Sequence, residues 1–394
     1  MVEMNGPERD RPIRVLRLIA RMNVGGPALQ VVAMARLIDP TQIEQHVLSG
    51  SVAAGEEDYL DLRAPDVKVT KVPGLGRSVR GIGDLKAFVF VVREIRRFRP
   101  DIVHTHTAKA GVLGRIAAFA LRVPVTVHTF HGHILHGYFS PRITKAVVLV
   151  EKLLAMRTTQ LISVGERVRD ELLAAGIGDP AKFEVVAPGV VDPVPPPRDA
   201  ARKRFGIPGD RTAIFFVGRL ARIKRAERFV ELAAHTVDSI PNAVFVIVGD
   251  GPERAELERQ AAPLGDRVLF AGWSGDMSSV YAAADLIVLT SDNEGMPVAL
   301  IEAAMQGVPA VTTDVGSVRQ VVLDGTSGTI VPVGDGGALA EAVVRLTHDK
   351  DLLRAYGLAA RQHAVSKFSE QRLADDIAGI YQRLFNQRNR RGTS

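Results

Sequence analysis

Two carboxylates, Glu294 and Glu302, stand on either side of a glycine–proline turn in SDNEGMPVALIEAAMQGVPAV, residues 291–311. A pair of this kind can serve as an acid and a base, can hold a ligand, or can lie on a solvated helix edge. Proline is favoured in the first turn of a helix and glycine just beyond its end, so we predict a helix from about Pro297 to Gly307. Glu294 then precedes the helix, and Glu302 lies less than two turns inside it.

The first turn of this helix is expected to offer unpaired backbone amides to a ligand. The amides of Gly295, Met296 and Val298 lack partners within the helix, and such amides attract anionic groups. The apolar residues that surround Glu302 make a solvated edge less favoured. The arrangement therefore favours a ligand-binding site. It does not favour a pair of carboxylates that activates water.

Two cations precede another predicted helix, in FFVGRLARIKRAERFVELAA, residues 215–234. The chain turns at Gly218 after an apolar strand and then presents Arg219 and Lys224. Two positive side chains beside a helix N-terminus can clamp a diphosphate. Arg222 and Arg225, in the same segment, are interpreted as surface charges.

Two glycine turns follow other predicted strands, and they differ in charge. NVGGPALQVVAMARL, residues 23–37, places Gly25 and Gly26 where backbone amides can approach a ligand, although it lacks the GxGxxG spacing of dinucleotide folds. FVIVGDGPERAELE, residues 245–258, carries Asp250 and further acids that repel phosphate. We therefore expect a ligand contact at the first turn and a structural role at the second.

Histidines gather after two predicted strands, in DIVHTHTAKAG (101–111) and HTFHGHILHG (128–137). Ligands bind at the carboxyl ends of the strands in an open parallel sheet, and histidine hydrogen-bonds sugars and phosphates near neutral pH. A structural hydrogen bond is an equal alternative for each ring. A zinc site is not favoured, because the sequence has neither HExxH nor a usual zinc spacing. No metal is expected.

Strands rich in Val, Ile and Leu alternate with helical segments along most of the chain, which predicts an α/β fold with doubly wound parallel sheets. The segment VVDPVPPPRD, residues 190–199, contains four prolines and forms a stiff connector. We predict two domains, residues 1–192 and 193–368, with a ligand site in the cleft between them. A helix over residues 369–385 follows and can pack back on the first domain.

Composition narrows the class of protein. The chain has 394 residues, 46% of them hydrophobic and 24% charged, as in a globular protein, and it has no cysteine. The amino terminus lacks the apolar core of a signal peptide, and no apolar run reaches the ~20 residues of a membrane helix, so a cytoplasmic protein is expected. The net charge of +6 falls in residues 1–192 (26 basic minus 20 acidic residues), but without interleaved aromatics it does not indicate binding to nucleic acid.

Taken in order, these segments resemble the family 4 retaining glycosyltransferases, which have the GT-B fold. The resemblance covers nearly the whole chain and includes HTFHGH, ISVGERVRDEL, VVAPGVVD, VGRLARIK, VGDGPERAEL and SDNEGMPVALIEA. The Glu-x7-Glu spacing combined with the Arg-x4-Lys spacing is its most specific part. It implies two Rossmann-like domains that face each other across a deep cleft, with the acceptor on the first and a nucleotide-sugar donor on the second.

The resemblance also implies roles for matching residues. The catalytic group would be His131, Arg219, Lys224 and Glu294. The donor would be bound by Gly25, Gly26, Gly218, Arg219, Lys224, Glu294, Gly295, Met296, Pro297, Val298 and Glu302. The acceptor would be bound by His106, Lys109 and His133.

Within these sets, the two cations would neutralise the donor diphosphate in place of a metal, and Glu302 would hold the ribose. Glu294 would orient the donor sugar, and His131 would contact that sugar and the transferring phosphate. No carboxylate nucleophile is required in the mechanism usually proposed for this class. Three positions depart from the family pattern, because Gly165, Pro188 and Arg225 stand where many relatives have serine, asparagine and glycine.

We therefore expect a metal-independent retaining glycosyltransferase that moves a hexosyl or N-acetylhexosaminyl group to a hydroxyl acceptor. The donor would be a nucleotide-diphosphate sugar, most simply a UDP-sugar. The product would belong to polysaccharide, glycolipid or natural-product assembly. The alternatives are a UDP-sugar epimerase of the same fold and a non-catalytic nucleotide-sugar binding protein. The basic first half suggests an anionic or lipid-linked acceptor and peripheral contact with the inner face of the membrane. The segment 141–157, apolar with cationic ends, either rests on that membrane or forms a core helix.

Overall fold

The computed structural model describes residues 11–53, 56–76, 81–132 and 141–392 of the chain. The chain divides into two compact units. Unit 1 comprises Met1–Gly189 together with Glu370–Ser394, and unit 2 comprises Val190–Ser369. Each unit has its own parallel sheet, and each is described by itself.

The sheet of unit 1 has seven parallel strands in the order β3-β2-β1-β4-β5-β6-β7. Its inner strands are buried on both faces, as expected where helices cover both sides of a sheet. The strands are β1 (Ile13–Ile19), β2 (Ile43–Ser49), β3 (Val69–Lys71), β4 (Ile102–His106), β5 (Val125–Phe130), β6 (Gln160–Ser163) and β7 (Phe183–Val185).

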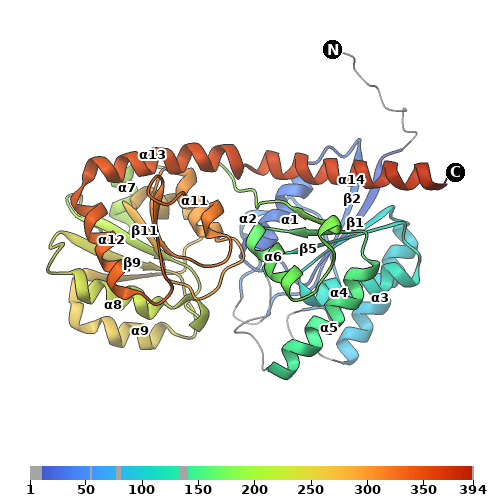
Figure 1. Cartoon of the computed structure of the whole chain (residues 1–394), viewed down its shortest axis with the longest axis horizontal. Coiled ribbons are helices and arrows are strands. Elements are labelled where there is room, and N and C mark those ends of the chain that lie inside the picture. The colour runs from blue at the N-terminus through green and yellow to red at the C-terminus, as the bar shows by residue number, and fades with distance from the viewer. Residues whose placement is uncertain (1–10, 54–55, 77–80, 133–140, 393–394) are drawn as a thin grey trace, which may run out of the picture. The chain divides into compact units, whose positions relative to one another are not determined.

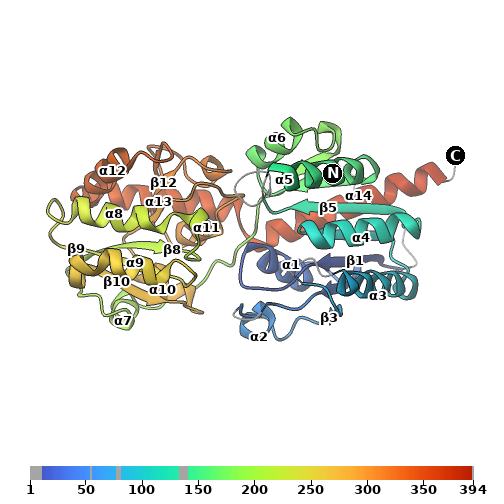
Figure 2. The ribbon, with the colours of Figure 1, turned by 90° about the horizontal axis from the view of Figure 1, so that it is seen from below.

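Helices cover both faces of this sheet. The helices of unit 1 are α1 (Gly26–Leu37), α2 (Tyr59–Arg63), α3 (Ile82–Phe98), α4 (Ala108–Ala120), α5 (Pro141–Arg157), α6 (Glu166–Ala174) and α14 (Glu370–Gly392). Figure 2 shows α3, α4 and α5 side by side across one face. On the opposite face α14 packs against α1, β1 and β5 (Figure 1).

The last helix of the chain belongs to unit 1 because of a buried stripe along its length. Leu373, Ile377, Ile380 and Leu384 recur at the helical spacing and are almost fully buried. The helix continues to Gly392, past the predicted end at residue 385. Residues 386–392 contain glutamine and several arginines, which are good helix formers, so the helix extends beyond its apolar stripe.

The sheet of unit 2 has six parallel strands in the order β10-β9-β8-β11-β12-β13. The strands are β8 (Thr212–Val217), β9 (Ala243–Val248), β10 (Val268–Gly272), β11 (Leu286–Leu289), β12 (Ala310–Thr313) and β13 (Gly328–Val331). The order reverses between β8 and β11, which is the switch point where doubly wound folds bind ligands.

The helices of unit 2 are α7 (Arg198–Arg204), α8 (Ala226–Thr236), α9 (Arg254–Ala261), α10 (Met277–Ala283), α11 (Val298–Met305), α12 (Gly336–His348) and α13 (Lys350–Lys367). A short 3-10 helix, η2 (Arg222–Lys224), precedes α8. In unit 2, α8 and α9 lie on one face of the sheet and α7 and α11 on the other (Figure 1). A core of isoleucine, valine and phenylalanine side chains joins the sheet to α8, α9 and α12.

Candidate active site

The carboxyl edge of the unit 2 sheet brings together two residues that are 70 positions apart in sequence. Lys224, at the end of η2, places its Nζ 2.6 Å from Oε1 of Glu294 in the β11–α11 loop. The hydroxyl of Ser291 donates to the same oxygen at 2.7 Å. The Glu294 carboxylate is only 9% exposed, so the cation and the hydroxyl hold it in one orientation.

Arg219 lies in the loop between β8 and η2, five residues before Lys224. Its side chain has no partner among the described residues. Its side chain is exposed, and its guanidinium makes no hydrogen bond or ion pair with any of them. An arginine that is free to form a bidentate contact at a strand's carboxyl end suits a phosphate group. The predicted pair of cations is therefore asymmetric, with one already paired and one available.

Backbone hydrogen bonds tie the lysine loop to the glutamate loop. The hydroxyl of Thr290 donates to the carbonyls of Lys224, at 3.1 Å, and Arg225, at 2.9 Å. The amide of Asp292 donates to the carbonyl of Ile223 at 3.0 Å. These bonds fix the register of the two loops, so the contact between Lys224 and Glu294 is preorganised.

Arg225 explains one of the departures from the family pattern. Its φ is +53° and its ψ +42°, a left-handed conformation that glycine adopts without strain. Its Nε compensates by pairing with Glu227 at 2.9 Å and by approaching Asp292 at 3.5 Å. An ion-paired arginine thus makes this left-handed turn at a position where the resemblance leads us to expect glycine.

The acidic turn after β9, predicted to be structural, packs directly on the loop that carries Arg219. A Cβ atom on Gly249 would stand 1.9 Å from the carbonyl oxygen of Gly218, and one on Gly251 would stand 2.2 Å from that of Leu220. Both glycines have positive φ. The two turns interlock through their backbones, and only glycine fits at these positions.

The start of α11 has the geometry that the sequence predicted. The helix begins at Val298 with Pro297 as its N-cap, and it ends two residues before Gly307. The amides of Gly295 and Val298 have no hydrogen-bond partner among the described residues, and the same holds for Met296. These unpaired donors lie next to Glu294, so the site offers backbone N–H groups and a fixed carboxylate together.

Glu302 is held from the side by an aromatic residue of α10. The buried hydroxyl of Tyr281 donates to its Oε2 at 2.9 Å. Glu302 itself is only partly buried, one turn into α11. The tyrosine therefore restricts the orientation of the Glu302 carboxylate.

A third loop, after β12, closes against the glutamate loop at Gly316. This glycine has φ +50°, and a Cβ atom there would stand 2.0 Å from the carbonyl oxygen of Glu294.

We expect Gly316→Ala to displace Glu294, to lower the melting temperature by several degrees and to reduce nucleotide affinity. Gly265→Ala is the matched control, because Gly265 has φ +55° and open space around it. Equal effects of the two substitutions, measured by thermal unfolding and by UDP titration, would contradict the contact.

The carboxyl edge of the unit 1 sheet carries the predicted glycines and histidines. Gly26 begins α1, and Gly25 is its N-cap. Nδ1 of His106, the last residue of β4, lies 3.0 Å from Nε2 of His131, which follows β5. The outer nitrogens of the pair, Nε2 of His106 and Nδ1 of His131, are buried without a partner among the described residues. Two neutral rings joined by one hydrogen bond leave one N–H donor and one lone pair at the outer nitrogens.

The histidines of unit 1 are held neutral by burial. Burial lowers the pKa of His131 to about 3. Burial also lowers the pKa of His104, His106 and His128 well below 6.5, and the charges of Arg17 and Arg115 add to the effect at His104 and His128 respectively. At neutral pH these rings therefore act as hydrogen-bonding groups and not as cations.

The proposed acceptor-side residues differ from one another in their surroundings. Lys109, in the first turn of α4, is paired with Asp84 at 2.5 Å and is largely buried. His133 lies outside the described residues. Thr107, directly after His106, has φ +67° and ψ +154°, a region that non-glycine residues rarely adopt. Backbone strain of this kind concentrates at functional sites, and no local pattern in the sequence indicated it.

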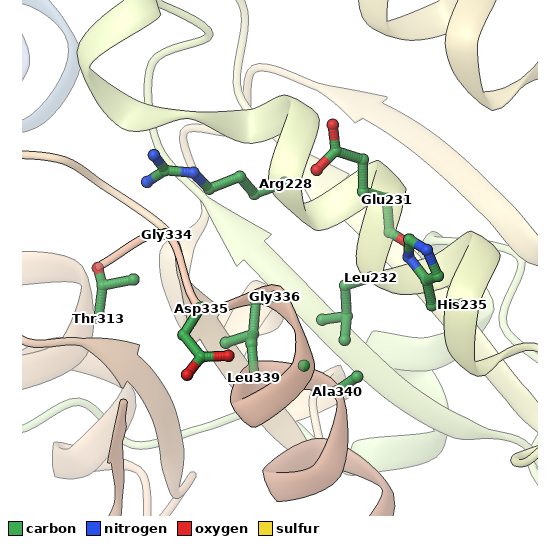
Figure 3. A pocket seen from close by; sticks show the side chains of 11 residues that line it. Arg228, Glu231, Leu232, His235, Thr313, Gly334, Asp335, Gly336, Leu339 and Ala340 are labelled. Carbon is green, nitrogen blue, oxygen red and sulfur yellow. The ribbon is translucent and has the colours of Figure 1, made fainter. Parts of the chain in front are cut away.

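A further pocket of unit 2 lies between α8 and the start of α12 (Figure 3). It has a volume of about 320 Å³ and is lined in part by Arg228, His235, Asp335 and Leu339. Arg228 donates to the carbonyl of Thr290 at 3.0 Å and pairs with Asp292 at 2.6 Å. The pocket thus adjoins the glutamate loop through one arginine, but none of its lining residues was a predicted site residue.

Two features are absent from the part of the chain that the structure describes. No group of three or more histidine, aspartate or glutamate side chains there is arranged to hold a metal ion. None of the described helices is long and apolar enough to cross a membrane.

Comparison with known proteins identifies the class. Residues 197–363 match the family model described as glycosyl transferases group 1, and residues 25–189 match the glycosyl transferase 4-like domain. A UDP-Gal:alpha-D-GlcNAc-diphosphoundecaprenol alpha-1,3-galactosyltransferase of Escherichia coli is 33% identical over 337 residues, which cover 82% of this chain and 85% of that protein. The chain belongs to the group 1 glycosyltransferases.

Other relatives are named for different compounds. A D-inositol 3-phosphate glycosyltransferase of Streptomyces bingchenggensis is 29% identical, covering 91% of this chain and 85% of that protein. A 2-deoxystreptamine glucosyltransferase of Streptomyces kanamyceticus is 27% identical, covering 90% of this chain and 98% of that protein. The names of these relatives therefore point to different acceptors.

Solved structures confirm the GT-B fold. The Anabaena protein HepE in complex with UDP superimposes with a TM-score of 0.79 at 22% identity, covering 94% of this chain and all of that one. WaaG, a glycosyltransferase involved in lipopolysaccharide biosynthesis, superimposes with a TM-score of 0.73 at 20% identity, covering 94% of this chain and 99% of that one. At these identities the likeness shows the fold alone, which consists of two Rossmann-like α/β domains.

Proposed function

We propose that this protein is a retaining glycosyltransferase that moves a sugar from UDP to a hydroxyl of its acceptor. The observation that carries the proposal is the carboxyl edge of unit 2, where a free arginine, a lysine fixed on Glu294 and unpaired amides of the α11 start lie on adjoining loops of the described chain. Structures of HepE with UDP and with UDP-glucose support a UDP-sugar donor.

In this proposal each group of the site has a separate task. Arg219 and Lys224 stabilise the negative charge that develops on the departing diphosphate, so no metal ion is required. Glu302 accepts hydrogen bonds from the ribose, and Glu294 with the neighbouring amides orients the sugar. His131 contacts that sugar and its phosphate.

The bond changes of the proposed reaction balance without a protein nucleophile. The bond from the anomeric carbon to the phosphate oxygen breaks, and the acceptor oxygen forms its bond on the same face. The acceptor proton passes to the departing phosphate oxygen. Binding two substrates in this geometry supplies much of the rate acceleration.

A donor screen in the presence of EDTA tests this function. We expect release of UDP only when a UDP-sugar and an acceptor are both present, and NMR of the product should show the anomeric configuration of the donor. Conversion of the UDP-sugar without an acceptor would identify an epimerase, and binding without turnover would identify a sensor. Activity that requires an added divalent metal would contradict the proposed role of the two cations.

We further propose that the acceptor is a lipid-linked sugar at the inner face of the membrane. The Escherichia coli relative acts, by its name, on a GlcNAc-diphosphoundecaprenol. In unit 1, the outer side of α5 exposes Leu149, Leu153 and Met156 at helical spacing, each more than half exposed. Exposed Lys145 and Arg157 flank them, as in helices that rest on an anionic surface.

A second helix on the same face of unit 1 repeats this pattern. On α3, Ile82, Leu85 and Val89 are exposed to 76%, 64% and 49%, and exposed Lys86 and Arg93 lie among them. The helix α4 lies between α3 and α5 (Figure 2). Apolar side chains with a cationic border fit an anionic bilayer better than they fit water.

Vesicle flotation checks this surface. We expect the protein to float with vesicles that contain anionic lipid at low salt, and we expect Leu149→Glu with Leu153→Glu to reduce the bound fraction about tenfold. The matched control is Leu358→Glu on α13, which changes a leucine that is 66% exposed in unit 2. Absence of flotation, together with transfer to a soluble aminocyclitol, would favour the soluble acceptors of the other relatives.

A further inference from the structure

A buried polar cluster in unit 1 joins the last helix of the chain to the histidine pair at the edge of the sheet. Arg17 of β1 pairs in register with His104 of β4, and His106 pairs in register with Thr129 of β5. Paired residues of neighbouring strands point to the same face of a sheet. That face is covered by α14, which contributes the fully buried Tyr381.

The hydrogen bonds of this cluster fix the position of every proton around Tyr381. Arg17 can only donate, and its Nη2 lies 3.1 Å from the tyrosine oxygen. Tyr381 bonds only Arg17 and His104 among the described groups and Arg17 cannot accept, so we assign the tyrosine proton to the bond with Nδ1 of His104, at 2.5 Å. The neutral His104 ring then carries its proton on Nε2 and donates it to the hydroxyl of Thr129, at 2.7 Å.

The acid–base properties of these groups agree with this assignment. Burial raises the pKa of Tyr381, so its hydroxyl stays protonated and remains a donor. Burial, with the charge of Arg17, lowers the pKa of His104, so its Nδ1 remains an acceptor. The other charged or titratable groups that face this ring are His106 and His131, which burial also keeps neutral.

Two short connections lead from His104 to the outer histidine. The rings of His104 and His106 lie 4.2 Å apart between centroids, and His106 bonds His131 through Nδ1 at 3.0 Å. Thr129, which His104 also holds, precedes His131 by two residues. His104 is thus linked to His131 through side-chain contacts with His106 and, along the chain, through Thr129.

We propose that Tyr381 of α14 is a positioning residue for His131, acting through the fixed tautomer and orientation of His104. This inference rests on the proposed function, in which His131 contacts the donor sugar and its phosphate. It assigns the carboxyl-terminal helix a part in the reaction, although Tyr381 itself touches only Arg17 and His104 among the hydrogen-bonding groups described. Loss of the tyrosine proton would leave His104 free to take either tautomer.

Tyr381→Phe tests the proposal, since it removes one oxygen and keeps the buried ring. We expect kcat for UDP release to fall about tenfold, while KM for the UDP-sugar changes less than about twofold, because a misplaced His131 costs mainly transition-state stabilisation. The matched control is Tyr356→Phe, a nearly buried tyrosine of α13 in unit 2, for which we expect unchanged kinetics.

A double-mutant cycle separates positioning from a general loss of packing. His104→Gln keeps a donor for Thr129 but removes the acceptor for Tyr381, and it should lower kcat by a similar factor. If both residues act along one path, Tyr381→Phe adds little on the His104→Gln background. Fully additive losses would overturn the proposal, and so would an unchanged kcat in Tyr381→Phe.

Imidazole NMR gives a readout that does not depend on turnover. The wild-type protein should show His104 as the Nε2–H tautomer, and Tyr381→Phe should shift both this tautomer and the ring nitrogens of His131. An unchanged His131 spectrum would overturn the inference even if the protein transfers sugar. If no UDP-sugar is consumed by the wild type, the proposed function fails, and the spectrum alone decides whether Tyr381 positions His131.

Discussion

Replacing Lys224 with alanine is expected to lower kcat for sugar transfer by about 10²- to 10³-fold, the usual cost of losing one preorganised group that stabilises transition-state charge. The side chain of Lys224 is held by Glu294, and its backbone carbonyl accepts a hydrogen bond from the hydroxyl of Thr290. In its proposed role this fixed side chain would stabilise the charge that develops on the diphosphate without first being ordered. Release of UDP from the UDP-sugar at saturating donor measures the effect.

Arg222→Ala is the matched control for this substitution. Arg222 lies two residues away in η2, is exposed, and was interpreted as a surface charge. The Arg222→Ala substitution changes the net charge by the same amount as Lys224→Ala. A general electrostatic effect on donor binding would therefore appear in both variants. Comparable losses in the two variants, or near-normal turnover in Lys224→Ala, would count against the site. Thermal unfolding of each variant shows whether the unpaired Glu294 disturbs the fold.

Sequence patterns predicted some features of the site and did not predict others. The start of α11 at Val298 and the apolar strands β8, β9 and β11 follow from capping residues and from apolar runs. The contact between Lys224 and Glu294 joins residues 70 positions apart. Only the resemblance to a family had assigned both residues to one donor site. The bond of Tyr281 to Glu302 had no local signal at all.

The regions that sequence patterns missed share a physical cause. The helices α12 and α13 and the strand β13 lie in a stretch where short apolar runs are interrupted by glycine and charge, so periodicity was weak there. The roles of Gly249 and Gly316 depend on turns that pack so closely that an added Cβ atom would stand about 2 Å from a carbonyl oxygen of the neighbouring turn, which only a three-dimensional arrangement reveals. The histidines were found as a group, but their division between the two faces of the sheet follows from strand register alone.

The same histidines predict a steep loss of stability in mild acid. In the unfolded chain a histidine binds a proton below its ordinary pKa of 6.5, whereas in the folded protein burial keeps His104, His106, His128 and His131 neutral to much lower pH. The unfolded state therefore binds more protons below pH 6.5, and stability falls as the pH decreases. Above pH 6.5 both states are neutral and these groups contribute nothing.

The expected size follows from linkage. At pH 5.5 each such histidine lowers the free energy of unfolding by about 1.4 kcal/mol, and four together lower it by about 6 kcal/mol, a large share of a typical total of about 5–15 kcal/mol. Carboxylates with lowered pKa, such as Asp276, titrate below this window. Denaturant unfolding between pH 7.5 and pH 5.5 measures the change.

Two substitutions assign this pH dependence to buried rings. His128→Asn keeps a group near Nδ1 that can bond the hydroxyl of Thr105, now 2.8 Å away, but removes one titrating ring, so it should reduce the loss between pH 7.5 and pH 5.5 by about a quarter. His235→Asn removes a ring that lies exposed on α8 and should leave the loss unchanged. A stability that stays flat down to pH 5.5, or an equal effect of both substitutions, would mean that the buried histidines accept protons without unfolding. The neutral hydrogen-bonding role assigned to His106 and His131 would then be wrong as well.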